Sequence, residues 1–218
     1  GATLKGTWLG PMETPNGVMV VLTVVVNGSN QITKILTDGT NTEQTGTISP
    51  VPGRNQIYSV KLSDGTTAGF YVDASMTHAV FVDEEFNFAV VQKGASGLAP
   101  LYVESEIFGQ NYSGNSVVLD HRFGLAQTMS TSANVSLIGA MDGFHSTGDW
   151  FSTTGGNDIH MKNKQYGVWT GEIKPEDGPK LCMRIIASPD KQVFGAYTGP
   201  LNWSGFPEDW TFSIMSRN

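Results

Sequence analysis

The stretch DGTTAGFYVDASMTHAVF (64–81) has a second copy in the chain, DGPKLCMRIIASPDKQVF (177–194). The two copies align without a gap, and their Asp-Gly, Ala-Ser and Val-Phe pairs coincide. A second match follows, in which EFNFAVVQK (85–93) and DWTFSIMSR (209–217) keep the same residue class at every position. The first copies end the first half of the chain and the second copies end the second half, so the pattern predicts a protein that is internally duplicated.

Both copies have the pattern of β-hairpins. Short runs of Val, Ile, Phe and Tyr alternate with Asp-Gly and Asn-Gly turns, which is typical of strands joined tightly. Apolar residues at helical spacing are not sustained anywhere. We therefore expect an all-β fold of antiparallel meanders that form barrels or sandwiches. The run VMVVLTVVV (18–26) is continuously apolar, which favours a strand buried on both faces.

A glycine-rich stretch separates the two halves. GASGLAP (94–100) is small and uncharged, as linkers are. We expect a first β-meander domain over 1–94, a linker over 95–100, and a second, related domain with loop insertions over 101–218. The pattern leaves open whether the halves form two barrels or close together into one.

Composition excludes several classes of partner. The chain has 218 residues and a net charge of −7 with no basic stripe, so we expect no nucleic-acid partner. No apolar run is long enough for a transmembrane helix, so we expect no transmembrane segment. The single cysteine, Cys182, excludes an intramolecular disulfide and a cysteine metal framework. Nothing in the sequence indicates a cofactor.

Composition also bears on localisation. Few lysines, many Thr, Ser, Asn and Gly residues and almost no cysteine are typical of exported bacterial proteins. The opening Gly-Ala-Thr is typical of a trimmed mature N-terminus. We expect a secreted or periplasmic protein of the bacterial cell envelope, with its signal peptide already removed.

Gly6-Thr7-Trp8 resembles the Gly-x-Trp on the first strand of lipocalins and related calycins, where the Trp plugs one end of the barrel. Gly167-Val168-Trp169 is similar. The Gly-Thr-Trp start, the Asp-Gly-Thr turns and a final strand ending in Lys also resemble secreted β-meander domains of unknown function from environmental bacteria. The resemblance implies export and a β-meander, and it carries no catalytic residues.

Two aromatic loops are candidate binding sites. The second half has an insertion, TGPLNWSGFPED (198–209), which contains Trp203 and Phe206. Another polar loop contains Trp150 and Phe151. Aromatic side chains in such loops either cap a barrel end or expose a stacking surface for a sugar or a protein partner.

Five residues form a candidate metal site. Imidazole and carboxylate groups suit Zn²⁺ or Ca²⁺, although their spacing matches no compact metal motif and a plain polar loop is the alternative. The five are Asp142, His145, Asp149, Asp158 and His160.

No catalytic motif stands out. The chain has no Gly-x-Ser-x-Gly elbow. Asp83-Glu84-Glu85 and its counterpart Glu208-Asp209 both precede a last strand. A solvated turn explains these acids better than a glycosidase pair, which needs two carboxyl groups facing each other across a cleft. We therefore predict no catalytic residues.

Three hypotheses for function follow. The first is a non-enzymatic secreted β module for binding or extracellular assembly, whose partner is a copy of itself, a glycan or a small apolar ligand. The alternative is a calycin-like carrier of a small apolar ligand. The second alternative is a metal-assisted hydrolase that uses His145 and His160. The carrier predicts one barrel whose cavity is lined by Trp8, Val20, Leu22, Phe70 and Phe88.

Overall fold

The chain is all-β, as the sequence predicts, and its strands pair antiparallel in a computed structural model. Among the described residues, no helix is long and apolar enough to cross a membrane. The structure describes residues 3–38, 43–98, 108–120, 128–140, 143–148, 157–160, 162–164, 167–173, 181–200 and 209–218.

The described chain divides into two compact units. The first contains the described residues up to 98 together with Ser188–Asp190, and the second contains the other described residues. The expected domain boundaries, 1–94 and 101–218 with a linker between them, stay a prediction.

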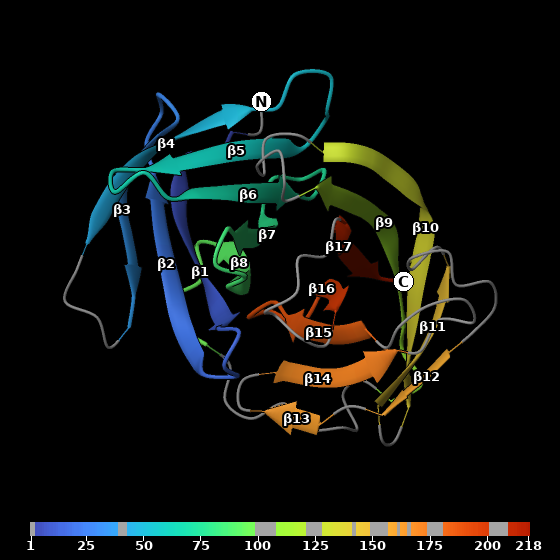
Figure 1. Ribbon diagram of the computed structural model, residues 1–218. Helices are drawn as coiled ribbons and strands as arrows, with labels where there is room; N and C mark the ends of the chain where they lie inside the picture. The colour runs from blue at the N-terminus through green and yellow to red at the C-terminus, as the bar shows by residue number, and fades with distance from the viewer. Residues whose placement is uncertain are drawn as a thin grey trace. The chain divides into compact units, whose positions relative to one another are not determined.

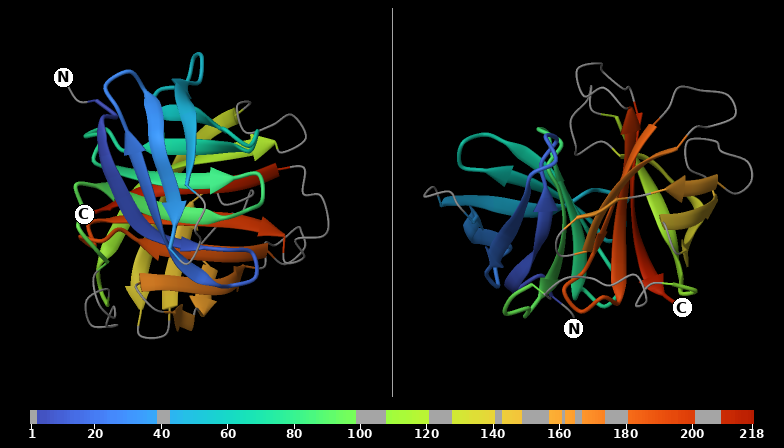
Figure 2. Two further views of the ribbon diagram at one scale, coloured as in Figure 1. Left: turned by 90° about the vertical axis from the view of Figure 1, so that its left-hand side faces the viewer. Right: turned by 90° about the horizontal axis from the view of Figure 1, so that it is seen from below.

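The first unit is a closed, eight-stranded, up-and-down barrel. Each strand pairs with the next, and β1 closes the barrel by pairing with β8, with Trp8 opposite Lys93. Figure 1 and Figure 2 show this unit in blue to green. Its strands are β1 (Gly6–Glu13), β2 (Met19–Val26), β3 (Gln31–Thr37), β4 (Gln44–Pro50), β5 (Ile57–Leu62), β6 (Thr67–Val72), β7 (His78–Asp83) and β8 (Phe88–Lys93).

Aspartate side chains shape two of the turns. At the end of β7, Asp83 Oδ1 accepts the backbone N–H groups of Glu85 and Asn87, both at 3.0 Å. After β6, Asp73 Oδ1 accepts the N–H of Thr77 at 2.9 Å. These local hydrogen bonds favour a turn over a continued strand, so the acids in the sequence mark where the strands end.

One end of the barrel is plugged by Trp8, which is fully buried. Its indole N–H donates to the carbonyl of Leu4 at 2.9 Å. Phe70 packs edge-on against its ring at 5.2 Å, and Lys93 Nζ lies 5.3 Å from the ring centroid. Trp8 and Phe70 therefore fill this end of the barrel, and the resemblance to calycins stays a prediction.

The first and last strands approach closely at Gly10. A Cβ on Gly10 would lie 1.8 Å from the carbonyl oxygen of Val90. Only glycine leaves room for β1 to cross β8 there, so closure of the barrel depends on it.

The apolar run 18–26 does not form a strand that is buried on both faces. In β2, Leu22, Val24 and Val26 are buried in the barrel core, while the residues between them are half-buried. A barrel wall has one inner and one outer face, so its strands alternate even where the sequence does not.

The second unit is a nine-stranded antiparallel sheet in the order β12-β11-β10-β9-β17-β16-β15-β14-β13. Its core includes Phe194, which packs against Tyr112 at 4.1 Å and Trp169 at 6.0 Å. The strands are β9 (Asn111–Asp120), β10 (Thr128–Ala140), β11 (Gly143–Gly148), β12 (Asn157–His160), β13 (Lys162–Lys164), β14 (Val168–Ile173), β15 (Leu181–Ala187), β16 (Val193–Pro200) and β17 (Asp209–Arg217).

The first strand of each unit pairs with the last strand of that unit in the same way. In the second unit Tyr112 of β9 lies opposite Arg217 of β17, and the guanidinium lies 5.9 Å from the ring centroid. That arrangement matches Trp8 and Lys93 in β1 and β8. Gly114 lies two residues after Tyr112, and a Cβ there would meet the carbonyl oxygen of Ile214 at 1.9 Å. Gly10 has the same place after Trp8.

The hairpins correspond with a shift of two residues from the gapless alignment. That alignment sets His78 against Lys191. In the structure it is Met76 that shares with Lys191 a left-handed backbone, with φ of 55° and 62°. A shift of two residues leaves every side chain on the same face, so the apolar pattern hides it. The second Gly-x-Trp, at Gly167–Trp169, leads into β14 and not into the first strand of its unit.

Candidate functional site

A cavity opens at the barrel end opposite Trp8. Its volume is about 650 Å³, within the usual range for small-molecule pockets. Because turns of an up-and-down barrel alternate between its ends, four of the connections meet here: β1–β2, β3–β4, β5–β6 and β7–β8. The lining residues are Met12, Thr14, Val20, Leu22, Ile35, Leu36, Thr37, Asp38, Gln44, Leu62, Asp64, Thr66, Phe81, Asp83, Glu85 and Asn87.

The deeper part of the cavity is apolar. Its side chains come from β1, β2, β3, β5 and β7, and they belong to the barrel core or pack against it. Beyond them the barrel is filled, with Trp8 and Phe70 in contact. We call this part the apolar floor; it consists of Met12, Val20, Leu22, Ile35, Leu62 and Phe81.

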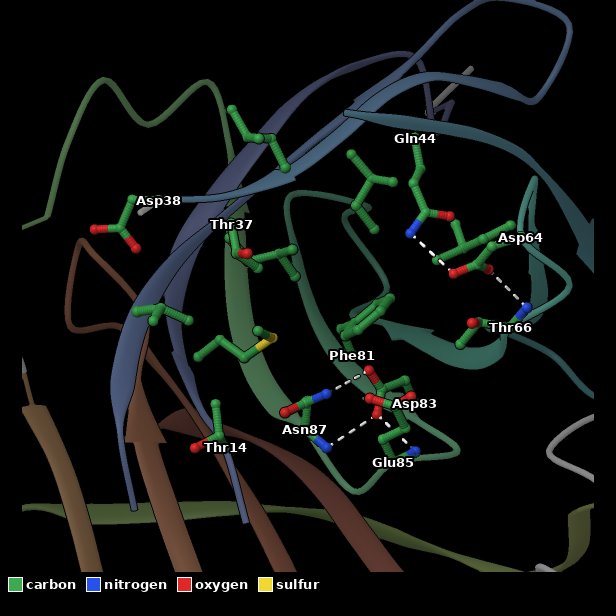
Figure 3. Close-up of a pocket in the computed structure, with 16 residues that line it drawn as sticks. Thr14, Thr37, Asp38, Gln44, Asp64, Thr66, Phe81, Asp83, Glu85 and Asn87 are labelled. Carbon is green, nitrogen blue, oxygen red and sulfur yellow. Dashed lines mark hydrogen bonds between the residues drawn. The ribbon is translucent and has the colours of Figure 1, made fainter. Parts of the chain in front are cut away.

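Four carboxylates surround the opening and form what we call the acidic rim: Asp38, Asp64, Asp83 and Glu85. Figure 3 shows Asp38, Asp64 and Asp83 on different sides of the same hollow. None of the described lining residues is Lys, Arg or His. Among the described residues, the opening is therefore a site of concentrated negative charge that no basic side chain offsets.

Asp83 is the buried member of the acidic rim, at 9% exposure. It lies two residues after Phe81 on β7, so both side chains face the cavity. Asn87 Nδ2 donates to its Oδ2 at 2.7 Å, in addition to the two turn N–H groups. Burial, together with the nearby Glu85 carboxylate, outweighs these hydrogen bonds and raises the pKa of Asp83 above its usual value.

Asp64 has the opposite environment, because it is exposed at the β5–β6 turn. Hydrogen bonds from the side chain and backbone of Thr66 lower its pKa. Gln44 Nε2 also donates to Asp64 Oδ2 at 3.0 Å. Gln44 Oε1 is buried and has no hydrogen-bond partner. The cavity thus holds one free acceptor beside a charged carboxylate.

A second polar cluster lies at the β6–β7 turn, around His78. Its Nδ1 lies 3.0 Å from Asp73 Oδ2, and its Nε2 lies 2.8 Å from Asp190 Oδ2. Burial disfavours the imidazolium, but the hydrogen bonds and charges of both aspartates outweigh it and raise the pKa of His78. The Asp73 carboxyl is half-buried, which would raise its pKa, yet its hydrogen bonds from His78 and Thr77 outweigh this and lower its pKa. The cluster stabilises the β6–β7 turn through these charged hydrogen bonds.

The predicted binding aromatics, Trp150, Phe151, Trp203 and Phe206, lie outside the described residues, and they stay a prediction.

The predicted metal ligands are only partly described, because Asp142 and Asp149 also lie outside. Strand register places His145 of β11 opposite Asp158 of β12, and His160 opposite Gly143. Within the part of the chain that the structure describes, no three His, Cys, Asp or Glu residues form a group that could hold a metal.

Of the five residues expected to line a carrier's cavity, two line it and three do not. Val20 and Leu22 line the cavity. Trp8 and Phe70 lie in the filled part of the barrel core. Phe88 is buried but belongs to neither the cavity lining nor the core cluster.

Sequence reasoning missed the acidic rim. The expected solvated turn at Asp83-Glu84-Glu85 is correct for Glu84 and Glu85, which are exposed, and wrong for Asp83, which is buried beside the cavity. The sequence does contain a signal for the rim, because an acid lies at the end of every second strand. Asp38 follows β3, Asp64 follows β5, and Asp83 ends β7.

No protein-family model matches the chain, and no curated protein matches it in sequence. Among solved structures, it is similar to a protein of unknown function from the DUF3598 family of Nostoc punctiforme PCC 73102. The similarity covers 98% of this chain and 96% of that protein, at 10% identity and a TM-score of 0.40. A similarity this weak supports no inference about function.

Proposed function

We propose that the first unit is a non-enzymatic binding module that holds the apolar part of a small ligand in its barrel. The cavity of about 650 Å³ above an apolar floor is the observation that carries this proposal. An eight-stranded barrel is wide enough for its side chains and one small ligand, and here one end is filled while the other is hollow.

The chemistry of the lining favours binding over reaction. Among the described residues of the cavity there is no Ser, Cys or Lys nucleophile and no His to activate one. The plug formed by Trp8 and Lys93 supports the resemblance to calycins, which are carriers of apolar molecules.

Duplication and export belong to the same proposal. The matching pairs Trp8–Lys93 and Tyr112–Arg217, each followed by a closely packed glycine, support two units that arose from one ancestor. The composition supports an exported protein. A module that binds a ligand outside the cytoplasm is consistent with both.

The test uses the neutral fluorophore N-phenyl-1-naphthylamine, whose emission rises in apolar surroundings. We expect saturable binding to the full chain with a dissociation constant of about 10 µM, the affinity typical of an apolar molecule of that size. Val20→Trp fills the cavity and should weaken binding about tenfold. Val18→Trp is the matched control, because Val18 is 56% exposed and does not line the cavity.

Absence of saturable binding to the folded protein would overturn the proposal. An equal loss in Val20→Trp and Val18→Trp would do so as well, because it would place the fluorophore elsewhere. Circular dichroism of each variant checks that the barrel is retained.

A further inference from the structure

We propose that the ligand of this cavity is a cationic amphiphile: a primary amine or other N–H-bearing ammonium group attached to an aliphatic or aryl body. The ammonium group lies at the acidic rim beside Asp83, and the apolar body lies on the apolar floor. This inference rests on the proposed binding function and names its ligand class.

The charge of the opening favours a cation. The acidic rim brings four carboxylates to one opening, and none of them forms an ion pair within the described part of the chain. Low-dielectric walls concentrate the field of such groups and attract counter-charge. A cation is therefore favoured there and an anion is disfavoured.

Acceptors that line the cavity have hydrogen-bonding capacity that the protein does not use. An ionised carboxylate accepts about four hydrogen bonds. Asp83 receives three from protein groups, which leaves a position for one ligand N–H. Gln44 Oε1 is a second buried acceptor without a partner. A group that donates N–H bonds and carries a positive charge fits the open position at Asp83, while Gln44 offers a further acceptor on another side of the same hollow (Figure 3).

Asp83 also lies deep in the opening. Its side chain is buried, and it lines the cavity together with Phe81 of the apolar floor. A buried carboxylate that has hydrogen bonds but no counter-charge is costly, and its burial raises the pKa of Asp83. A bound ammonium compensates the charge at the same place where an attached apolar body enters the cavity.

Other ligand classes fit less well. A hydrated metal ion makes no use of six apolar lining residues, and no metal-holding group is found in the described residues. A fatty acid has the right body but brings a fifth negative charge to the opening. A neutral sugar leaves the apolar floor unused.

The experiment compares decylammonium, 1-decanol and decanoate, each titrated calorimetrically into the full chain below its micelle concentration. The three share one apolar body, so differences in affinity report the head group. We expect decylammonium to bind about tenfold more tightly than decanol, and decanoate to bind most weakly. Raising NaCl from about 50 mM to about 500 mM should shrink the advantage of the cation.

Variants locate the charge effect. Asp83→Asn should weaken decylammonium about tenfold and leave decanol unchanged, because a buried partner of the cation is lost. Glu85→Gln should weaken decylammonium about threefold, as is typical of an exposed pair. Glu84→Gln is the matched control: it removes the same charge from the same turn, but Glu84 does not line the cavity.

The outcomes are distinguishable. If none of the three amphiphiles binds, the proposed function fails and this inference fails with it. If decanol binds as tightly as decylammonium, or decanoate binds best, the binding function stands and the cationic ligand is wrong. If Glu84→Gln weakens decylammonium as much as Glu85→Gln and Asp83→Asn do, the attraction comes from overall charge, and the assignment to the rim is overturned. Glu85 is exposed, so its variant keeps the test decisive even if Asp83→Asn does not fold.

Discussion

His78 shows how a single side chain links the stability of this barrel to pH. Its ring is held between Asp73 and Asp190, and the hydrogen bonds and charges of these partners, acting against burial, raise its pKa above the usual 6.5. A raised pKa means that the folded protein binds the proton more tightly than the unfolded chain does. The stabilisation is therefore complete below pH 6.5 and is lost as pH rises through the pKa of the folded state.

We predict that the first unit unfolds at lower urea concentration at roughly pH 8.5 than at roughly pH 5.5. In His78→Gln this part of the pH dependence should disappear, and stability at the lower pH should fall by about 2 kcal/mol, because a charged hydrogen-bonded group is lost. Urea unfolding followed by tryptophan fluorescence measures both. Persistence of the full pH slope in His78→Gln would show that other groups cause it.

The same residue scale explains one error of sequence reasoning. Asp83 is in a run of three acids, and three adjacent acids usually indicate a solvated turn. Whether one of them points inward depends on the alternation of side chains along the strand. Phe81 faces the cavity, so Asp83, two residues later on β7, faces it as well. The run of acids alone does not contain that information.

At the scale of the strands, closure of the barrel depends on β1 passing very close to β8. We predict that Gly10→Ala destabilises the protein by about 3 kcal/mol, because its Cβ would meet backbone and not a side chain that can move. Gly69→Ala is the matched control in β6, where the nearest atom to an added Cβ is 4.0 Å away. Equal urea midpoints for the two variants would contradict this account of closure.

The strand pattern itself was readable from the sequence, because the alternation of apolar runs and turns is local. The hairpin 64–81 was recognised as β6 and β7 with their turn. The register between the two proposed repeats was not, because a shift of two residues preserves every inward and outward position. The strand pairing reveals it, because Val72 opposite Ala79 corresponds to Ala187 opposite Phe194. The left-handed backbone at Met76 and Lys191 agrees, and neither residue is the glycine that normally marks such a turn.

At the scale of each whole unit, the two sheets differ in whether they have edges. The barrel has none, whereas the described sheet of the second unit ends at β12 and β13. We predict that backbone amides of β1 and β8 exchange with deuterium as slowly as those of β6, while β12 and β13 exchange at least about 100-fold faster. Hydrogen-exchange mass spectrometry resolves these segments. Fast exchange throughout β1 would indicate that the barrel opens along its β1–β8 pairing.

The acidic rim is a property of the complete barrel. Asp38, Asp64 and Asp83 are far apart in sequence, and each is unremarkable in its own turn. The up-and-down topology places every second turn at the same end, and this gathers their charges around one opening. The sequence could predict strands and turns, but the common location follows only once the barrel is known to be closed and its strand order is fixed.

The position of Trp8 has a consequence for how fast one ligand of the cavity can replace another. Because the indole and Phe70 fill the far end of the barrel, the described residues leave the proposed ligand the cavity opening as its route in and out. On that proposal, the first ligand must leave before another can enter. A competing ligand cannot displace the first one through the filled end of the barrel. The observed rate of replacement should then approach a ceiling set by departure of the first occupant, however much competitor is added.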